Sequence, residues 1–555
     1  MADQADFPDI YVDESVATGG VGSQADPYSD FSEINWTTGG DNSVFDYYDG
    51  SPAASVTINL EKGETWREQL TIGASGTETY PILVRATGTG ADPIVSGADV
   101  LTGFVVDNGT VYKKTGVTTA PFSVVYDGVM LTWIEGGTTS VGASEWDWDS
   151  DVLYVNVGED PDDGTLEASQ RSYAISSGNE DYITVDGLTL QGGKWGNFII
   201  GNNASAETVG IQNCTIEHSG VDGVDVYCDT SGDNLFVTDC IIRNNGGSGV
   251  NVQNDYPVSG GTVSGCTIFG NGVNSKARDQ VHCGIMGDLA NWIIFRNEVY
   301  SNTPLATGTE SYACHEIYNA KASGGKVIFY ENEVYGSEMG NGIKSVGSAD
   351  YYFNNVHGNL ASGLQGTHNS VASLTTAYRF WNNILWENGV GNLGSGISLQ
   401  DKGTGTYSAE INGNIFYKNG SSGGHELYLE DVCSSLDIHN NILFAEDGRR
   451  TLLSVNQTGT VSIDNNLHWR GDGDPAIYYN GGARSWATWQ GYGFDVSGIN
   501  DNPDMTNPGG EDFTLTADSP CIGAGDDTLG SPYNIALLPG STWPSGVLTG
   551  DQDDY

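Results

Sequence analysis

A short phrase of polar and apolar positions recurs along residues 181–480. Each copy has an Asn, Asp or Gly, one small or polar residue, an apolar pair, a loop, and an apolar strand that opens with glycine. Apolar and β-branched runs bounded by Gly and Asn predict short strands, and the copies contain almost nothing that could form a helix of three turns. The chain is therefore predicted to be all-β.

The copies follow one another at intervals of 22–35 residues, which indicates a solenoid with one coil per copy and insertions as loops. In a parallel β-helix, equal positions of successive coils stack at about 4.8 Å. We expect the asparagines at the second position of the phrase to form a hydrogen-bonded ladder and the cysteines to be small buried residues of the same column. The aligned positions are Cys214, Cys240, Cys266, Glu298, Glu333, Asn355, Asn383, Asn414, Asn441 and Asn466.

The pattern divides the chain into four regions. Residues 1–100 are predicted to hold an N-terminal cap and the first irregular coils. Residues 101–170 alternate between apolar and polar positions and predict an antiparallel β insertion, in which tryptophans beside acidic residues either pack or stack on sugar rings. Residues 171–480 hold about ten regular coils of a parallel β-helix, and residues 481–555 form a C-terminal flank and tail.

The repeated phrases resemble those of a known superfamily. "NCTIEHSG", "DCIIRNNGGSGV", "NNVHGNLASGLQ" and "GNIFYKNG" are similar to right-handed parallel β-helix repeats of pectate-lyase-like proteins. The tail "DFTLTADSPCIGAGDD" resembles the closing segment of secreted members. The resemblance implies a right-handed coil and a carbohydrate-active protein. It leaves the reaction open, because the superfamily contains lyases, hydrolases, epimerases and phage tailspikes.

The net charge of −51 argues against two classes of binding partner. Such a surface repels nucleic acid and anionic membranes, so neither is expected to bind. Solubility in a salty habitat explains the acidity, and scattered Ca²⁺ sites are the alternative. No apolar run is long enough to span a membrane. The start at Met1 is polar, and we expect a secreted protein whose signal peptide has been removed. The eight cysteines permit disulfides in a secreted protein but do not require them, and Cys283 and Cys314, near the same place on adjacent coils, are the first pair to test.

Chemistry is expected on the outward face of the glycine-led strands. Their inward residues are predicted to be Val224, Val250, Ile285, Ile317, Ile343, Leu364, Ile397 and Leu427. Alternation then turns the residue on either side outward. The residue immediately before each inward residue is glycine, except at Glu316 and Glu426. This column of glycines predicts a shallow trough that the two glutamates interrupt. The following column is Asp225, Asn251, Met286, Tyr318, Lys344, Gln365, Ser398 and Tyr428.

The two longest insertions fall just before this strand in consecutive coils and are expected to wall the trough. Six of the 21 Lys and Arg residues lie within residues 276–344, which favours an anionic substrate over ordinary surface ion pairing. The candidate catalytic residues are His315, Glu316, Tyr318 and Lys344. The candidate substrate-binding residues are Arg278, His282, Gln365 and His368.

Three functions remain open, all with a polysaccharide as partner. A lyase acting on a uronate glycan needs a base and positive charge, which Lys344, Tyr318, His315 and Arg278 supply. A glycoside hydrolase needs two carboxyl groups, of which Glu316 is one. A non-catalytic tailspike or adhesin is expected to be a trimer, whereas an enzyme is expected to be a monomer.

A further resemblance concerns metal binding. The segment "SGVDGVDVYCD" is similar to the acidic Ca²⁺-binding strand of one pectate lyase group, and "NGIKSVG" to the strand that carries the lysine base of that group. The resemblance implies Asp222 and Asp225 as Ca²⁺ ligands and Lys344 as base. A structural turn is the alternative for the two aspartates.

Overall fold

The computed structural model describes residues 9–36, 55–134, 141–253, 260–273, 282–302, 314–320, 325–368, 376–390, 394–401, 407–421, 424–430, 433–454, 459–472 and 475–526. These residues are nearly all in strands and turns. They fall into two compact units, which are Met1–Asp288 with Asn302–Tyr312, and Leu289–Ser301 with Ala313–Tyr555. Short helical segments occur at η1 (Phe31–Glu33), η2 (Pro161–Asp163), α1 (Trp486–Gly491) and η4 (Pro508–Gly510).

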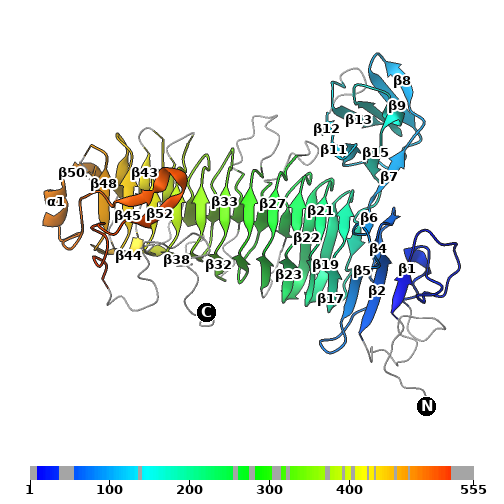
Figure 1. Ribbon diagram of the computed structural model, residues 1–555, viewed down its shortest axis with the longest axis horizontal. Coiled ribbons are helices and arrows are strands. Elements are labelled where there is room, and N and C mark those ends of the chain that lie inside the picture. The colour runs from blue at the N-terminus through cyan, green and yellow to red at the C-terminus, as the bar shows by residue number, and fades with distance from the viewer. Residues whose placement is uncertain are drawn as a thin grey trace. The chain divides into compact units, whose positions relative to one another are not determined.

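In the first unit, successive coils contribute one strand to each of three parallel sheets, as Figure 1 shows for β17 to β23. The first sheet contains β1 (Ile10–Val12), β2 (Val56–Glu61), β5 (Ile82–Thr87), β17 (Ile183–Asp186), β20 (Val209–Gln212), β23 (Leu235–Thr238) and β26 (Gly261–Ser264). The second contains β3 (Thr65–Trp66), β6 (Ile94–Ser96), β18 (Thr189–Gln191), β21 (Thr215–Glu217), β24 (Ile241–Arg243) and β27 (Thr267–Phe269). The third contains β4 (Leu70–Thr71), β16 (Ile175–Ser176), β19 (Gly196–Glu207), β22 (Asp222–Asp233), β25 (Val250–Gln253) and β28 (Ile285–Gly287).

The predicted antiparallel insertion is confirmed. Its strands are β7 (Ala98–Leu101), β8 (Val105–Asn108), β9 (Val111–Thr115), β10 (Val124–Tyr126), β11 (Val129–Met130), β12 (Thr132–Trp133), β13 (Glu145–Asp149), β14 (Val152–Asn156) and β15 (Leu166–Ser169). They form two sheets, ordered β11-β10-β15-β7 and β12-β13-β14-β9-β8, with only the β12–β13 pair parallel among the pairs described. Trp146 is fully buried in the core between them, and Trp133 and Trp148 pack against it. Packing therefore explains these tryptophans.

The second unit repeats the three-sheet plan. The first sheet contains β29 (Ile293–Phe295), β32 (Val327–Tyr330), β35 (Ala349–Tyr352), β38 (Thr376–Trp381), β41 (Tyr407–Asn412), β44 (Cys433–His439) and β47 (Thr460–Asp464). The second contains β30 (Glu298–Tyr300), β33 (Glu333–Tyr335), β36 (Asn355–His357), β39 (Ile384–Trp386), β42 (Ile415–Tyr417), β45 (Ile442–Ala445) and β48 (Leu467–Arg470). The third contains β31 (Ile317–Asn319), β34 (Ile343–Ser345), β37 (Leu364–His368), β40 (Ser395–Asp401), β43 (His425–Leu429), β46 (Arg450–Ser454), β49 (Ile477–Tyr479) and the antiparallel β50 (Gly482–Arg484).

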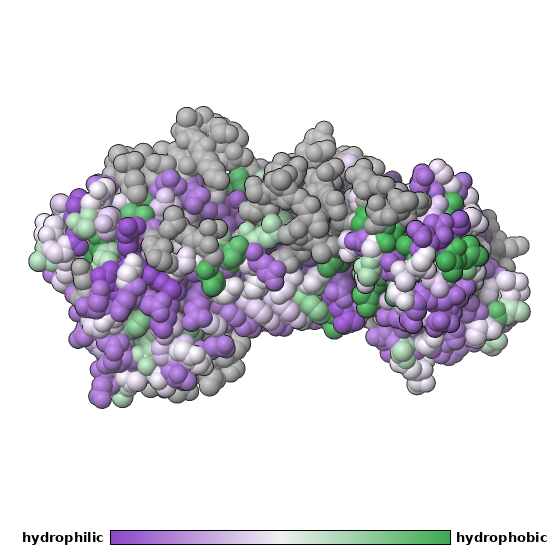
Figure 2. All heavy atoms as spheres, turned by 90° about the horizontal axis from the view of Figure 1, so that it is seen from above, coloured by the Kyte–Doolittle hydropathy of each residue, from purple (hydrophilic) through white to green (hydrophobic). Residues whose placement is uncertain are grey.

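The last described strands pack on the second sheet of this unit. The hairpin of β51 (Met505–Asn507) and β52 (Asp512–Leu515) buries Phe513 and Leu515 against the isoleucines and leucine that begin the strands of this sheet. On the face that Figure 2 shows, hydrophilic residues predominate and hydrophobic ones occur in small groups. The described residues on this face therefore form no extended apolar patch.

The inward column of the third sheets is confirmed. Val224, Val250 and Ile285 pair in register in the first unit. Ile317, Ile343, Leu364, Ile397 and Leu427 do so in the second unit. All eight side chains are buried. Stacked apolar residues of equal register are what period-two alternation in a parallel strand predicts.

The asparagine ladder is confirmed for four positions and corrected for three. Asn383 Nδ2 donates to Asn414 Oδ1 at 2.9 Å, and Asn414 donates in the same way to Asn441, which donates to Asn466. The residue that precedes Asn383 in this ladder is Asn354, and Asn332 precedes Asn354. The prediction that Glu298, Glu333 and Asn355 occupy the ladder is wrong by one residue, because these three begin strands of the second sheet.

The predicted cysteine column is present as free thiols. Cys266 Sγ accepts the backbone N–H of Cys240 at 3.4 Å, in the way that an asparagine Oδ1 accepts in the ladder. Cys214, Cys240 and Cys266 are buried, and none of the eight cysteines of the chain is in a disulfide. Cys283 and Cys314, the first pair to test, are therefore not bonded to each other.

Candidate functional site

The residue before each inward apolar residue points into the coil rather than outward. A Cβ on Gly342 would lie 2.6 Å from Val356 Cγ1 and 2.9 Å from Asn359 Nδ2, and a Cβ on Gly363 would lie 2.8 Å from Asn388 Nδ2. The glycines therefore leave room for a second ladder, which runs from Asn359 through Asn388 to Asn419. The trough predicted from this column does not exist.

The two glutamates in this column are buried. Glu426 has 0% of its surface exposed, and its Oε2 accepts the Nδ2 of Asn419 at 2.7 Å. It takes the place of the next asparagine and ends the second ladder. Glu316 stands at the equivalent position before Ile317 and is also 0% exposed. The prediction that Glu316 faces a substrate is wrong, because a side chain with no exposed surface cannot contact one in this conformation.

The outward column that follows the inward residues is confirmed, and it brings Lys344 to Tyr318. These residues are register partners on β31 and β34, one coil apart. Lys344 Nζ lies 5.2 Å from the centre of the Tyr318 ring, and both side chains are half-buried. An ammonium over an aromatic face is attracted by the ring quadrupole. A cation and a phenol are thus held together on an accessible face.

Three polar residues support this pair. Asn341 donates its backbone N–H to His315 Nδ1 at 3.0 Å, and its Nδ2 donates to Gln365 Oε1 at 2.9 Å. Because Nδ1 of His315 accepts, the ring proton is on Nε2 and the imidazole is neutral. The centres of the His315 and Tyr318 rings lie 5.0 Å apart at an interplanar angle of 67°, an edge-to-face arrangement. We call His315, Tyr318, Asn341, Lys344 and Gln365 the lysine–tyrosine cluster.

The members of the cluster differ in how far they are buried, and this separates positioning residues from substrate-facing ones. His315 is 1% exposed and Gln365 is 8% exposed, whereas Tyr318 and Lys344 reach the surface. His315 therefore positions Tyr318, and the substrate-facing groups are Tyr318 and Lys344. Sequence reasoning missed Asn341. It stands two residues before the inward Ile343, and counting two residues back from each inward residue would have found this second outward column.

The remaining predicted binding residues are Arg278, His282 and His368. Arg278 and the surrounding insertion lie outside the described residues. His282 belongs to the first unit and is 3% exposed. His368 ends β37, where its backbone pairs with Asp401. Their part in substrate binding stays a prediction.

Two members of the predicted basic patch form ordinary ion pairs. Arg296 Nε lies 2.6 Å from a carboxylate oxygen of Glu331, and Lys326 Nζ lies 2.9 Å from one of Asp350. The local density of basic residues is therefore explained in part by ion pairing. Lys344 remains the cation that the outward column of the second unit presents beside an aromatic ring.

The predicted metal ligands form a buried carboxyl pair in the first unit. Asp222 accepts the N–H of Ser248 and the Nδ2 of Asn251, each at 2.8 Å. Burial raises the pKa of Asp222 to about 6. Asp225 is 8% exposed, and its Oδ1 has no partner within the described chain. Burial, and then the charge of Asp222, raise the pKa of Asp225 well above its usual range.

This pair does not fit a Ca²⁺ site. Calcium takes six to eight oxygen ligands from charged or carbonyl groups. Both oxygens of Asp222 already accept hydrogen bonds, and the described residues contain no group of three or more His, Cys, Asp or Glu that could hold a metal. A Ca²⁺ ion elsewhere in the chain stays a prediction.

Comparison with known proteins places the chain by its fold. Residues 173–361 match the family model described as "Right handed beta helix region". Together with the coils of both units, this match identifies a right-handed parallel β-helix protein, as the repeat predicted. No curated protein matches the chain. Among the described residues, no helix is long and apolar enough to cross a membrane.

Three solved structures illustrate the likeness. A complex of XylC with xylose is 11% identical, with 90% of this chain and 87% of that chain covered and a TM-score of 0.43. Pectate lyase Pel9A is 13% identical, with 79% and 80% covered and a TM-score of 0.39. The alginate lyase from Paenibacillus sp. str. FPU-7 is 14% identical, with 69% and 93% covered and a TM-score of 0.34.

Proposed function

We propose that the protein is a secreted polysaccharide lyase that cleaves a uronate-containing glycan by β-elimination at the lysine–tyrosine cluster. The observation that carries the proposal is the half-buried pair of Lys344 and Tyr318, one coil apart and 5.2 Å from nitrogen to ring centre. A solenoid presents such positions as a regular column along its axis, which suits an extended polymer. The resemblance of the C-terminal segment to secreted proteins supports the location.

The reaction needs a base and a positive charge. The base removes the proton on the carbon that bears the uronate carboxylate, and the electron pair forms a carbon–carbon double bond as the glycosidic oxygen leaves and takes up a proton. Positive charge near the carboxylate stabilises the carbanion that develops. With Tyr318 as the base, Lys344 supplies the positive charge. With Lys344 as the base, its neutral amine takes the proton, and the positive charge comes from another residue, for which Arg278 is the candidate. His315 holds the Tyr318 ring through the edge-to-face contact of the two rings, whose centres lie 5.0 Å apart.

Two conservative variants assign the roles. Lys344→Arg keeps the positive charge but provides a group that does not deprotonate. If Tyr318 is the base, this variant retains much of the activity, and Tyr318→Phe abolishes it. If Lys344 is the base, the opposite holds. Each variant must first show a cooperative thermal unfolding transition, so that a lost rate is not the result of misfolding.

The function is tested with a panel of uronate and neutral polysaccharides. A lyase produces both new reducing ends and absorbance near 235 nm, which comes from the unsaturated sugar at the new end. A hydrolase produces reducing ends alone. A folded protein that retains glycans on a column and yields neither signal is a binding protein, and the proposal is then wrong. Light scattering tests the expected monomer against the trimer of a tailspike.

Glycoside hydrolysis is the second candidate, and the carboxyl pair of the first unit favours it. Asp222 and Asp225 are three residues apart on β22, and burial raises the pKa of both carboxyl groups. A glycosidase needs two carboxyl groups, one of which is an acid with a raised pKa. Reducing ends without 235 nm absorbance, lost in Asp225→Asn and kept in Lys344→Ala, would establish this function instead.

A further inference from the structure

A second polar cluster lies on the outward face of the second unit, on β40, β43 and β46. Ser398 and Tyr428 follow Lys344 and Gln365 in the same outward column. His425 and Arg450 belong to the other outward column, two residues before the inward leucines, and are register partners. Four side chains from three successive coils therefore lie on one face.

Two atoms of this cluster are buried without a partner. Ser398 is 1% exposed and His425 is 5% exposed. Ser398 Oγ and His425 Nδ1 make no hydrogen bond with any part of the chain that the structure describes. A buried polar atom left unpaired costs about 1–3 kcal/mol. Such atoms in adjacent columns of an outward face point to a ligand that completes their hydrogen bonds.

Arg450 supplies an unpaired cation in a chain of net charge −51. The guanidinium carbon lies 4.2 Å from the centre of the Tyr478 ring, and no described carboxylate lies within ion-pair distance of it. The arginines that do pair with carboxylates in the described chain are Arg67, Arg171, Arg243, Arg296, Arg379, Arg449 and Arg470. Arg450 thus keeps its donors for another acceptor, although acidic residues are abundant.

His425 is suited to the same acceptor. Burial, and then the charge of Arg450, lower the pKa of His425 to about 4, so the imidazole is neutral at physiological pH. A neutral imidazole donates one hydrogen bond without adding charge. The ring lies 5.5 Å from the Tyr428 ring at an interplanar angle of 21°. The half-buried Tyr428 is held next to both Ser398 and His425 and offers an aromatic face.

We propose that Arg450, His425, Ser398 and Tyr428 form a binding site for an anionic sugar residue. Arg450 donates to a carboxylate or sulfate of the sugar, and the Tyr428 ring packs against its apolar face. His425 and Ser398, whose polar atoms are buried in this conformation, donate to the sugar after a side-chain rotation that accompanies binding. Tyr428 stands three register steps from Lys344 in one outward column, or about 14 Å at about 4.8 Å per coil. The site rests on the proposed function in that the polymer lies along this column.

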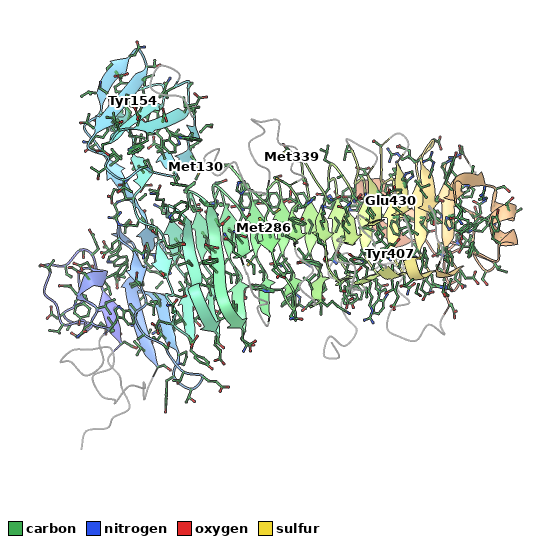
Figure 3. All side chains as sticks on the ribbon, turned by 180° about the vertical axis from the view of Figure 1, so that it is seen from behind. Met130, Tyr154, Met286, Met339, Tyr407 and Glu430 are labelled. Carbon is green, nitrogen blue, oxygen red and sulfur yellow. The ribbon has the colours of Figure 1, made fainter. Side chains whose placement is uncertain are left out.

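The end of β43 that carries the site is anchored. The hydroxyl of the buried Tyr407 donates to the backbone carbonyl of Glu430 at 3.1 Å, and Figure 3 labels both residues in the same part of the unit. Glu430 follows the buried Leu429 at the strand end. The backbone that presents His425 and Tyr428 is therefore held by the sheet and by this cross-sheet bond, which preorganises the site.

Equilibrium binding to the full-length protein tests the proposal. The probes are a uronate oligosaccharide, a sulfated oligosaccharide and a neutral oligosaccharide of equal length, measured by titration calorimetry. We expect one of the two anionic probes to bind, and Arg450→Ala to weaken that binding about tenfold or more, since hydrogen bonds to charged groups are the strong ones. His425→Gln and Ser398→Ala should weaken it less.

Arg484→Ala is the matched control. It removes an arginine that also lies over a tyrosine ring, with the guanidinium carbon 5.8 Å from the centre of Tyr492. This control should bind like the unmodified protein. Equal affinity of Arg450→Ala and the unmodified protein, or preference of the unmodified protein for the neutral probe, overturns the proposal. Because binding needs no turnover, anionic binding without any 235 nm signal would refute the lyase function while keeping the site.

Discussion

Asn419 Nδ2 donates to Glu426 Oε2 at 2.7 Å inside the coil, where neither side chain has exposed surface. The other carboxyl oxygen of Glu426 has no partner among the described residues. A glutamate thus ends a ladder of asparagines by supplying the last acceptor. The first measurable consequence is a pH-dependent stability.

Burial raises the pKa of Glu426 from 4.5 to about 8. The folded protein therefore binds this proton more tightly than the unfolded chain does. The contribution of Glu426 to stability is complete below pH 4.5 and is lost as the pH rises through 8. We expect Glu426→Gln, which cannot ionise, to melt at a higher temperature than the unmodified protein at pH 9 and to differ little at pH 5. The exposed Glu338→Gln serves as control, and equal pH profiles of all three proteins would contradict the assignment.

The one-residue correction of the ladder is tested by adjacent asparagines. Asn354 is fully buried, donates to Asn383 Oδ1 and Phe329 O, and accepts from Asn332. Asn354→Ala should lower the free energy of unfolding by about 3 kcal/mol or more, because several buried groups lose their partner at about 1–3 kcal/mol each. Asn355→Ala should cost about 1 kcal/mol. Urea unfolding of both variants measures the difference, and a larger loss for Asn355→Ala would restore the original register.

Removal of either substrate-facing group should reduce catalysis. We expect Tyr318→Phe or Lys344→Ala to lower kcat on the uronate substrate by about a hundredfold or more, the scale of a lost acid or base. Lys326→Ala removes a lysine of the same unit that is ion-paired with Asp350 and should keep near-normal kcat. Initial rates at 235 nm measure all three. Near-full activity of both Tyr318→Phe and Lys344→Ala would place the catalytic centre elsewhere.

Salt should promote the reaction. A net charge of −51 repels an anionic polymer over long range. The Debye length falls from about 30 Å at 0.01 M salt to about 3 Å at 1 M, which screens this repulsion before it screens direct contacts at Lys344 and Arg450. We therefore expect kcat/KM to rise between these concentrations. A steady fall with added salt would show that attraction by local cations dominates.

The free thiols give a chemical test. Under denaturing, non-reducing conditions all eight cysteines should be alkylated. In the native protein the half-buried Cys521 should react first, because the other seven are buried. Mass spectrometry counts the labels. Two unlabelled cysteines after denaturation would indicate a disulfide, with Cys283 and Cys314 as the first pair to examine.

The sequence by itself determined the repeat, the inward column and most of the ladder. Alternation along a strand has a period of two, so Ile343 and Leu364 could be placed inside without a structure. The same alternation placed Tyr318, Lys344 and Gln365 in one outward column. The sequence also placed Asn383 and Asn441 correctly in the ladder. The residues before them, Asn382 and Asn440, have a positive φ, and asparagine tolerates this conformation.

The tertiary structure decided which residue belongs to the ladder in those coils where the residue before it is not an asparagine. Arg296, Glu331 and Phe353 adopt φ values of 53–55°, although side chains of these types rarely do so. The sequence pattern therefore took Asn297, Asn332 and Asn354 as the first residue of the phrase and placed the ladder one residue too late. Stacking of coils imposes the turn at an equivalent place in every repeat, and this long-range constraint outweighs the local preference.

The tertiary structure also decided which way Glu316 and Glu426 point. Alternation holds within a strand, but the chain bends as it enters the strand, and the residue at that bend turns inward beside the second ladder. Glycine is common there because a side chain would collide with the interior, not because the surface is hollow. His425 and Arg450 were missed for the same reason. Their outward position follows from the bend, which an alternation with a period of two residues cannot predict.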